Sequence, residues 1–361
     1  MNRTRTRWVA MVFFGVMTAY VAGPRPGSAQ SITEFPVPTP GSNSQFIASG
    51  PDGALWFTES NGDKVGRITT AGSIMEFALP AGGSHPAGIV TGPDGGIWFT
   101  EFFGNRIGRI TTGGAITEFA VPGANPALIT AGPDSALWFT ENGSNQIVRI
   151  TTAGAISAFP LPSPGSEPFG ITTGPDGALW FTERAGNKIG RITTSGVITE
   201  FPLSGVDPVD IVAGPDGALW FTESGSNQIG RITTAGVVSE FPLPSTGSAP
   251  FGITAGPDGA LWFTELFGNR IGRITTSGSI SELTLPSAGS NPVGITSGPD
   301  GALWFAESIG NRIGRIALAP PVPTSKDQCK SGGYQHFIDP ATGQPFRNQG
   351  QCVSFVEHHR P

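Results

Sequence analysis

Three acidic residues lie beside prolines in segments whose sequence varies along the chain. Glu167 and Asp207 each directly precede a proline, and Asp210 follows the second of these prolines by two residues. If the two segments are neighbours in the fold, the carboxylates converge and could hold a hard cation through oxygen ligands. That cation would be Mg²⁺, with Ca²⁺ as the alternative. The same three residues would also suit plain solvated surface, and the sequence leaves both interpretations open.

His85 occupies the same pre-proline position in an earlier segment. Its imidazole could act as a general base if a partner and a substrate lie within hydrogen-bonding reach. A single loop histidine can equally be exposed to solvent without a chemical role.

Aromatic side chains occur in the same variable segments. Phe169 and Phe251 directly follow a proline, whereas Phe102, Phe103 and Phe267 lie in loops that follow a glutamate. Exposed apolar groups around a concave surface usually mark binding. These five phenylalanines therefore predict contact with a small-molecule or peptide ligand.

A stretch that recurs seven times must position these residues. It reads Gly-Pro-Asp-Gly-Ala-Leu-Trp-Phe-Thr-Glu in residues 174–183, and its tryptophans are spaced by 42, 40, 42, 40, 42 and 42 residues. The marker tryptophans are Trp56, Trp98, Trp138, Trp180, Trp220, Trp262 and Trp304. A fixed period near 40 residues is typical of propeller blades.

Each repeat contains four short runs rich in Ile, Phe, Trp and Thr, bounded by Gly, Pro, Asn or Ser. Such runs predict strands, and four antiparallel strands in each of seven repeats predict an all-β, seven-bladed β-propeller. The last repeat ends after Ile316 without a fourth strand, while a matching run at Ile32–Pro38 precedes the first marker tryptophan. We expect this N-terminal strand to complete the last blade and close the ring.

Blade geometry divides the loops between two faces. The loop between the second and third strands and the connection into the next blade share one face, called the variable face because its sequence differs between repeats. The Gly-Pro-Asp-Gly and Thr-Thr-x-Gly turns share the opposite, invariant face. Each repeat also has a glutamate at the end of its second strand and an arginine in its third, such as Glu183 and Arg191. A pair present in every blade predicts a structural pair or a hydrogen-bonded turn.

Composition and charge narrow the range of partners. The 361 residues include 53 Gly and 33 Pro, only 13% are charged, and the net charge is −6. This negative balance argues against nucleic acid and anionic membrane surfaces as partners. We expect a monomer.

The chain divides into four regions. Residues 1–29 have the pattern of a bacterial Sec-type signal peptide, with an uncleaved anchor as the alternative. Residues 30–318 form the propeller, 319–325 a Pro-rich linker, and 326–361 a small tail that contains Cys329 and Cys352. Export would allow these two cysteines to form a disulfide. We therefore expect a secreted protein with no membrane span after signal cleavage.

The repeat resembles that of the virginiamycin B lyases, also called streptogramin B lyases. The resemblance covers residues 31–318 and rests on Gly-Pro-Asp-Gly-x-Leu-Trp-Phe-Thr-Glu followed by Asn-x-Ile-Gly-Arg-Ile-Thr-Thr-x-Gly. It implies Mg²⁺-dependent elimination that opens the ester of a cyclic depsipeptide, in which the metal polarises the carbonyl and a histidine removes a proton.

The same resemblance implies site residues. The family has its histidines directly after the proline of a late inner strand, where this chain has Phe251 and Val293. The family also has a metal-binding glutamate directly before the proline of its last blade. In this chain Glu167 is similar to that glutamate but lies in an earlier blade, and the last blade has Asn291 at this place. The carboxylate that ends the last blade's second strand corresponds to Glu307.

Three functions remain open from the sequence. The first is a carbon–oxygen lyase acting on a cyclic ester peptide, with His85 and Glu307 as the catalytic candidates. The second is a non-catalytic extracellular module that binds a ligand or a protein on its variable face. The third is a metal-assisted hydrolase of lactones or esters.

Overall fold

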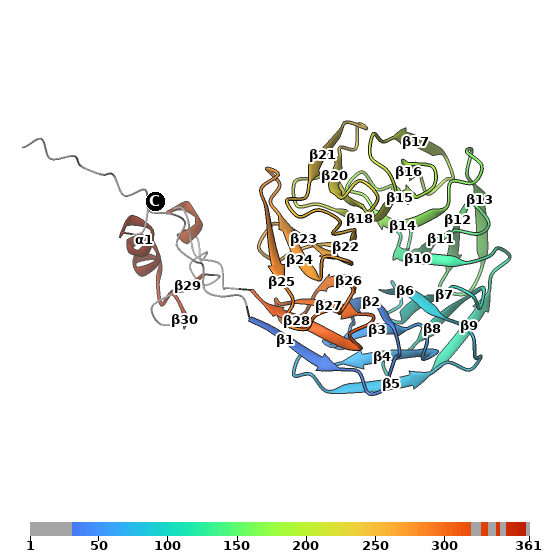
Figure 1. The fold of residues 1–361 in the computed structure, drawn as a ribbon, viewed down its shortest axis with the longest axis horizontal. Helices are drawn as coiled ribbons and strands as arrows, with labels where there is room; N and C mark the ends of the chain where they lie inside the picture. Colours follow the sequence, from blue (N-terminus) through green and yellow to red (C-terminus); the bar gives the residue numbers. More distant parts are fainter. Residues whose placement is uncertain (1–30, 319–325, 331–336, 340–343, 359–361) are drawn as a thin grey trace, which may run out of the picture.

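Figure 1 shows seven four-stranded antiparallel sheets arranged around a central axis. The computed structural model describes residues 31–318, 326–330, 337–339 and 344–358. The predicted signal peptide and linker lie outside these residues. The predicted all-β, seven-bladed propeller with four antiparallel strands per blade is confirmed.

Each blade begins at the central axis and ends at the circumference of the disc (Figure 1). Blades 1 to 3 contain, in this order, β2 (Ser44–Ser49), β3 (Leu55–Glu59), β4 (Lys64–Ile68) and β5 (Ile74–Ala78); β6 (Pro86–Thr91), β7 (Ile97–Glu101), β8 (Arg106–Ile110) and β9 (Ile116–Ala120); and β10 (Pro126–Ala131), β11 (Ala136–Glu141), β12 (Gln146–Thr151) and β13 (Ile156–Pro160). Blades 4 to 6 contain β14 (Pro168–Thr173), β15 (Leu179–Glu183), β16 (Lys188–Ile192) and β17 (Ile198–Pro202); β18 (Pro208–Ala213), β19 (Leu219–Glu223), β20 (Gln228–Ile232) and β21 (Val238–Pro242); and β22 (Pro250–Ala255), β23 (Leu261–Glu265), β24 (Arg270–Ile274) and β25 (Ile280–Thr284). Blade 7 contains β26 (Pro292–Ser297), β27 (Leu303–Glu307), β28 (Arg312–Ala317) and β1 (Ser31–Pro36).

Blade 7 joins the two ends of the propeller. β1 pairs antiparallel with β28, with Ser31 opposite Ala317 and Pro36 opposite Arg312. Phe35 of β1 stacks on Trp304 of the same blade at a centroid distance of 5.7 Å. The N-terminal strand completes the last blade as predicted, so β28 is not left as an open edge.

Alternating side chains in the second strand of each blade stack neighbouring blades together. In blade 1, Trp56 packs toward blade 2, whereas Phe57 packs against Trp304 of blade 7. All seven marker tryptophans are at most 1% exposed. Gly66 of β4 leaves room for the Phe57 ring, because an added Cβ would lie 2.1 Å from its Cζ. A blade cannot bury both of its faces alone, so stacking supplies the core.

An Asp–Trp–Arg unit stabilises the invariant face in every blade. In blade 4, Asp176 Oδ1 accepts a hydrogen bond from Trp180 Nε1 at 3.0 Å, and Oδ2 accepts one from Arg191 Nε at 2.7 Å. Burial alone would raise the pKa of Asp176, but the bonds from Trp180 and Arg191 hold it below its usual value. The repeated arginine thus forms a structural pair as predicted, but its partner is the turn aspartate and not Glu183.

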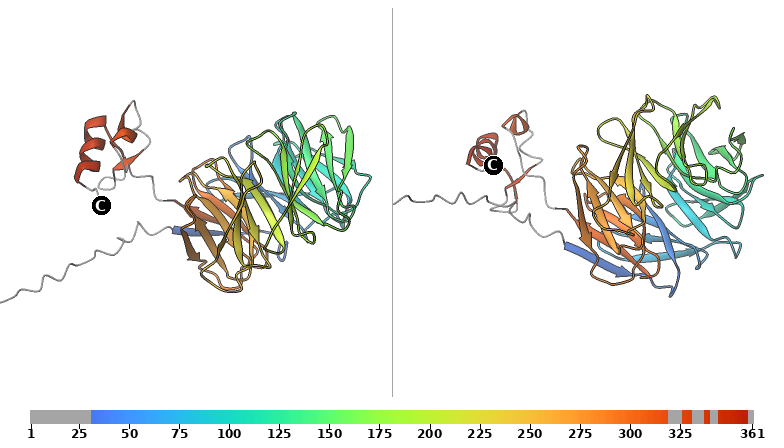
Figure 2. Two further views of the ribbon diagram at one scale, coloured as in Figure 1. Left: turned by 90° about the horizontal axis from the view of Figure 1, so that it is seen from above. Right: turned by 45° about the horizontal axis from the view of Figure 1, so that its top comes forward.

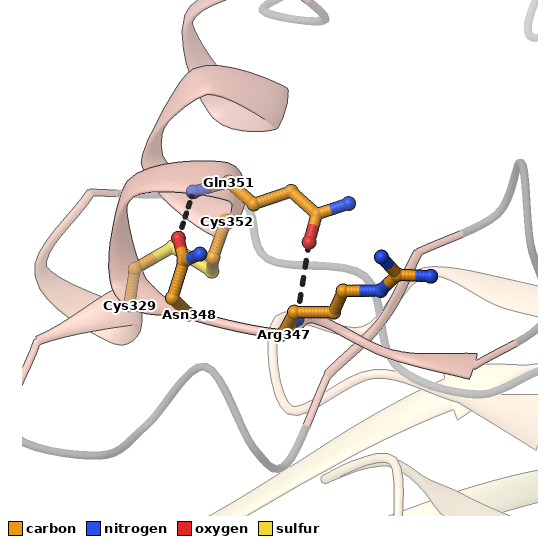
Figure 3. The surroundings of a disulfide bond; sticks show 5 residues. All are labelled: Cys329, Arg347, Asn348, Gln351 and Cys352. Carbon is orange, nitrogen blue, oxygen red and sulfur yellow. Dashed lines mark hydrogen bonds between the residues drawn. A yellow bond between two sulfur atoms is a disulfide. The ribbon is translucent and has the colours of Figure 1, made fainter.

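The described part of the tail is held together by the predicted disulfide. Cys329 at the end of η1 (Asp327–Cys329) is bonded to Cys352 in α1 (Gln349–His358), as Figure 3 shows. Both cysteines are fully buried, together with Phe346 and Val356. Two short strands, β29 (Ile338–Asp339) and β30 (Gln344–Pro345), form a small hairpin. None of the helices in the described part of the chain is long and apolar enough to cross a membrane.

Candidate functional site

The innermost strands of the seven blades surround the central axis (Figures 1 and 2). They are β2, β6, β10, β14, β18, β22 and β26. Their sequences contain a single ionisable side chain, Asp210 of β18. Any ligand that reaches the axis from the variable face therefore meets mostly backbone, apolar side chains and one carboxyl group.

Three phenylalanine rings from the innermost strands of blades 1, 4 and 6 meet one another. Phe169 of blade 4 and Phe251 of blade 6 make an edge contact with centroids 6.0 Å apart, and Phe46 of blade 1 lies 6.2 Å from Phe251. All three are half-buried. Because blades 4 and 6 flank blade 5, the first two rings approach each other across β18. We call Phe46, Phe169, Phe251 and Asp210 the axial cluster.

Phe46 and Asp210 occupy the same place in their blades, the third position of the innermost strand. Four blades have glycine there, and an added Cβ at Gly170 would lie 2.9 Å from the Asp210 Cα. Blades 1, 3 and 5 instead have Phe46, Leu128 and Asp210. The sequence predictions included Asp210 and the two other rings but missed Phe46. Its replacement of the glycine was the signal that could have found it.

Asp210 connects blade 5 to blade 6. Its Oδ1 accepts a hydrogen bond from the backbone N–H of Ile211 at 2.9 Å, and its Oδ2 accepts one from Ile253 at 3.1 Å. The residue as a whole is partly exposed. Burial raises the pKa of Asp210 to about 7, although the two N–H donors act in the opposite direction. Near neutral pH this group can therefore gain or lose a proton.

Asp207 is engaged by an arginine. Arg184 donates from Nε to Asp207 Oδ1 at 2.7 Å and from Nη2 to Oδ2 at 3.1 Å, a two-point ion pair. The same guanidinium lies over the Phe169 ring, 5.2 Å from its centroid. Arg184 and Asp207 thus lie beside the axial cluster.

The three predicted metal ligands do not assemble into a cation site. Glu167 is exposed, Asp207 binds Arg184, and Asp210 binds backbone N–H groups. Across the part of the chain that the structure describes, no group of three or more His, Cys, Asp or Glu side chains could hold a metal ion. The residue directly before the innermost strand also adopts positive φ in every blade, 53° at Glu167 and 56° at Asp207. Asp and Asn tolerate that conformation better than most residues, which gives Asp207 a backbone role.

His85 belongs to a second aromatic group on blade 2. Its ring makes an edge contact with Phe103 at 5.0 Å, and Phe103 makes another with Phe102 at 5.0 Å. Phe103 is 62% exposed, and Phe267 on blade 6 is 71% exposed. The structure thus divides the predicted ligand contacts: Phe169 and Phe251 meet at the axis, Phe102 and Phe103 meet beside His85, and Phe267 projects from a blade 6 loop.

Glu307 is one of seven equivalent buried glutamates. Its side chain is 0% exposed and its Oε2 lies 3.8 Å from Arg312 Nη1. Burial raises the pKa of Glu307 to about 7, the nearby Ser290 hydroxyl opposes this, and the nearby Glu34 adds to it. Glu59 in blade 1 has the same kind of surroundings, with Ser42, Glu76 and Lys64. Glu307 therefore has the environment of a scaffold residue, and its predicted catalytic role stays a prediction.

A family model described as the virginiamycin B lyase family matches residues 24–207 and 202–323. The chain belongs to the virginiamycin B lyase family. It is similar to a solved streptogramin B lyase structure with a TM-score of 0.78 and 40% identity, over 80% of this chain and 98% of that chain. It is equally similar to a catalytically inactive His→Ala variant of virginiamycin B lyase from Staphylococcus aureus with quinupristin: TM-score 0.77, 40% identity, 80% of this chain and 100% of that chain. A comparison with curated proteins finds no match.

More distant neighbours of this virginiamycin B lyase family member share the fold alone. One is the extracellular domain of a hybrid two component system from B. thetaiotaomicron, with a TM-score of 0.64 and 15% identity over 78% of this chain and 40% of that chain.

The residues present do not fit the Mg²⁺ and histidine that the family resemblance implies. Phe251 stands where a histidine is expected, and it packs against two other rings. Asn291 stands where a metal-binding glutamate is expected, and Glu307 is enclosed by Ser290 and Arg312. The central site keeps its place in the fold but presents aromatic surface.

Proposed function

We propose that this virginiamycin B lyase family member is a binding protein that holds a peptide-like ligand with aromatic or apolar groups on its variable face. The observation that supports this most directly is the meeting of Phe46, Phe169 and Phe251 at the central axis. Three half-buried rings supply a large apolar contact area and retain surface for a ligand. The disulfide of the tail supports a location outside the cytoplasm, where such bonds persist.

Binding of quinupristin, measured by calorimetry, tests this proposal. Phe251→Ala should weaken binding about tenfold or more, because it removes the ring that touches both others. Phe267→Ala is the matched control, since it removes an exposed phenylalanine of the same blade outside the axial cluster. Equal affinities for the two variants would reject the axial cluster as the site. Failure of the unmodified protein to bind would reject quinupristin-like peptides as its ligand class.

A carbon–oxygen lyase is the second candidate, favoured by the 40% identity to a streptogramin B lyase over 80% of the chain. The test is incubation with a streptogramin B antibiotic and Mg²⁺, with a chelator-treated control. A chelator-sensitive product of unchanged mass would establish elimination and overturn a purely binding role. A product heavier by one water would indicate hydrolysis instead. Binding without any product supports the first proposal.

A further inference from the structure

Asp210 is the one ionisable group on the seven innermost strands, and its position singles it out. It replaces a glycine that four other blades have at the same place. Its two carboxylate oxygens each accept one backbone N–H, from Ile211 and Ile253. An ionised carboxylate has about four acceptor sites, so each oxygen keeps capacity for a further donor.

The rings of the axial cluster come from the two inner strands that flank β18 and from blade 1. Phe169 lies next to Gly170, where an added Cβ would lie 2.9 Å from the Asp210 Cα, and Phe251 lies two residues before Ile253, whose N–H binds Asp210. Phe46 approaches Phe251 from blade 1. The faces of phenylalanine rings carry negative electrostatic potential, and they attract cations most strongly where water is partly excluded.

Asp210 has no cationic side chain paired with it in the described structure. Among the residues that the structure describes, no Lys or Arg forms a salt bridge with Asp210. Arg184 lies over Phe169 but is bound by both oxygens of Asp207. Asp210 thus lies between the two phenylalanine-bearing strands without a paired cation, while the guanidinium over Phe169 is held by Asp207.

We propose that the axial cluster is a subsite for an alkylammonium group of the ligand. This inference rests on the proposed function, because it assigns the chemistry of one part of the same binding face. The ammonium would contact the free acceptor sites of Asp210, and its alkyl groups would pack on Phe46, Phe169 and Phe251. Aromatic rings recognise quaternary ammonium groups in other proteins, and a carboxylate attracts them through its opposite charge.

Proton binding must compete with this cation. Since the pKa of Asp210 is raised to about 7 by burial, affinity for an ammonium should increase as the pH rises from ~6 to ~8. The strands packed against Asp210 are β14, β15, β19 and β22, and their other titratable groups are Glu183 and Glu223 at the strand ends. Burial raises the pKa of both glutamates too, so only variants of Asp210 can assign the pH dependence.

The test compares choline with its neutral isostere, 3,3-dimethylbutan-1-ol, by NMR titration of the full chain. We expect choline to bind about tenfold more tightly at pH ~8. Asp210→Gly and Asp210→Leu should both abolish this preference and its pH dependence. These variants introduce residues that other blades already have at the same position, and thermal melting checks their folding.

The outcomes separate this inference from the proposed function. Equal binding of choline and the isostere, sensitive to Phe251→Ala, would keep an apolar site and overturn the ammonium subsite. Quinupristin binding with no response to choline would also overturn the subsite while leaving the proposed function intact. A choline preference that survives in both Asp210 variants would place the cation elsewhere and overturn the assignment. Absence of binding for all three probes would reject both proposals.

Discussion

Glu223 is a buried carboxyl group without a balancing cation. In five blades the first residue of the third strand is Lys or Arg, as Lys188 is in blade 4, but in blade 5 it is Gln228. Gln228 donates a hydrogen bond to Glu223 at 2.5 Å. Burial raises the pKa of Glu223 to about 7, against the Gln228 bond, and Glu240 adds to the increase. The backbone of Gly205 lies close to this carboxyl group, because an added Cβ on Gly205 would lie 2.3 Å from Glu223 Oε2.

Replacing this group should stabilise the protein only at higher pH. A folded pKa of about 7, above the ordinary 4.5, favours folding at low pH, and this contribution is lost as the pH rises through 7. Glu223→Gln cannot ionise, so we expect its melting temperature to exceed that of the unmodified protein by about 2 °C at pH ~8 and to match it near pH ~4.5.

Glu183→Gln is the control for that measurement, because Lys188 lies near Glu183 and partly balances its charge. It should stabilise less at the same pH. Melting curves at both pH values decide the matter, and a destabilised Glu223→Gln at pH ~8 would show that the carboxylate is needed in its charged form.

At the scale of strands, blade 7 lacks one of the contacts that hold neighbouring blades together. In six blades a threonine hydroxyl in the second strand donates to a carbonyl of the next blade and accepts an N–H from its own innermost strand. These residues are Thr58, Thr100, Thr140, Thr182, Thr222 and Thr264. β27 has Ala306 instead, at the interface between blades 7 and 1.

Restoring this hydroxyl should strengthen the contact between these two blades. Ala306→Thr would let the side chain bond to the neighbouring inner strands, which is worth about 1 kcal/mol of folding free energy for a typical hydrogen bond. Thermal or urea unfolding measures the gain. Thr264→Ala, which removes the 2.7 Å bond to the Val293 carbonyl, should lower stability by a similar amount. A destabilised Ala306→Thr would mean that the packing around Phe57 has no room for the larger side chain.

The strands could be predicted well from the sequence because the same pattern occurs in all seven repeats. Turn residues and the Trp period place every strand, and the unmatched run at Ile32–Pro38 predicts the closing strand. The pairing of Arg191 with Asp176 escaped prediction, because these residues meet through strand register and not through a recognisable motif. The buried state of Glu307 was equally hidden, since a carboxylate at a strand end gives no sign of the side chains that cover it.

The site was predicted in part for the same reason. Phe169 and Phe251 follow prolines and stand out against the repeat, whereas Phe46 lies in the first repeat, where Ser44 replaces the proline. The contact between the Phe169 and Phe251 side chains across blade 5 depends on how the blades are arranged around the axis. A local sequence pattern does not give this arrangement. The predicted carboxylate cluster failed because Asp207 finds a closer partner in Arg184.

At the scale of the whole molecule, the closing strand has fewer chain connections to the ring than the fourth strand of any other blade. In the described structure, β1 joins the propeller through only its C-terminal end, whereas β9 in blade 2 is connected at both ends. Phe35 and Phe119 make equivalent stacks on Trp304 and Trp98, at 5.7 and 5.4 Å. Replacing the stacked phenylalanine by alanine should therefore favour local opening more in blade 7 than in blade 2.

Hydrogen exchange can measure this difference. Phe35→Ala should accelerate exchange of the β28 amides about tenfold, because local opening of β1 becomes less costly. Phe119→Ala should leave the β8 amides more protected than those of β28. Equal acceleration in both blades would show that β1 is held as firmly as a strand with two connections.

The pairing of Ser31 with Ala317 also determines how the disc can be attached to something else. These residues lie at the end of blade 7 that carries the Gly298–Gly301 turn, on the invariant face and on the two strands farthest from the axis. Phe169 and Phe251 of the axial cluster lie at the start of their inner strands, next to the opposite, variable face. A tether attached before Ser31 or after Ala317, such as a sensor-surface tag or a cell-wall anchor, would therefore hold the disc at its invariant face and leave the variable face free for a ligand.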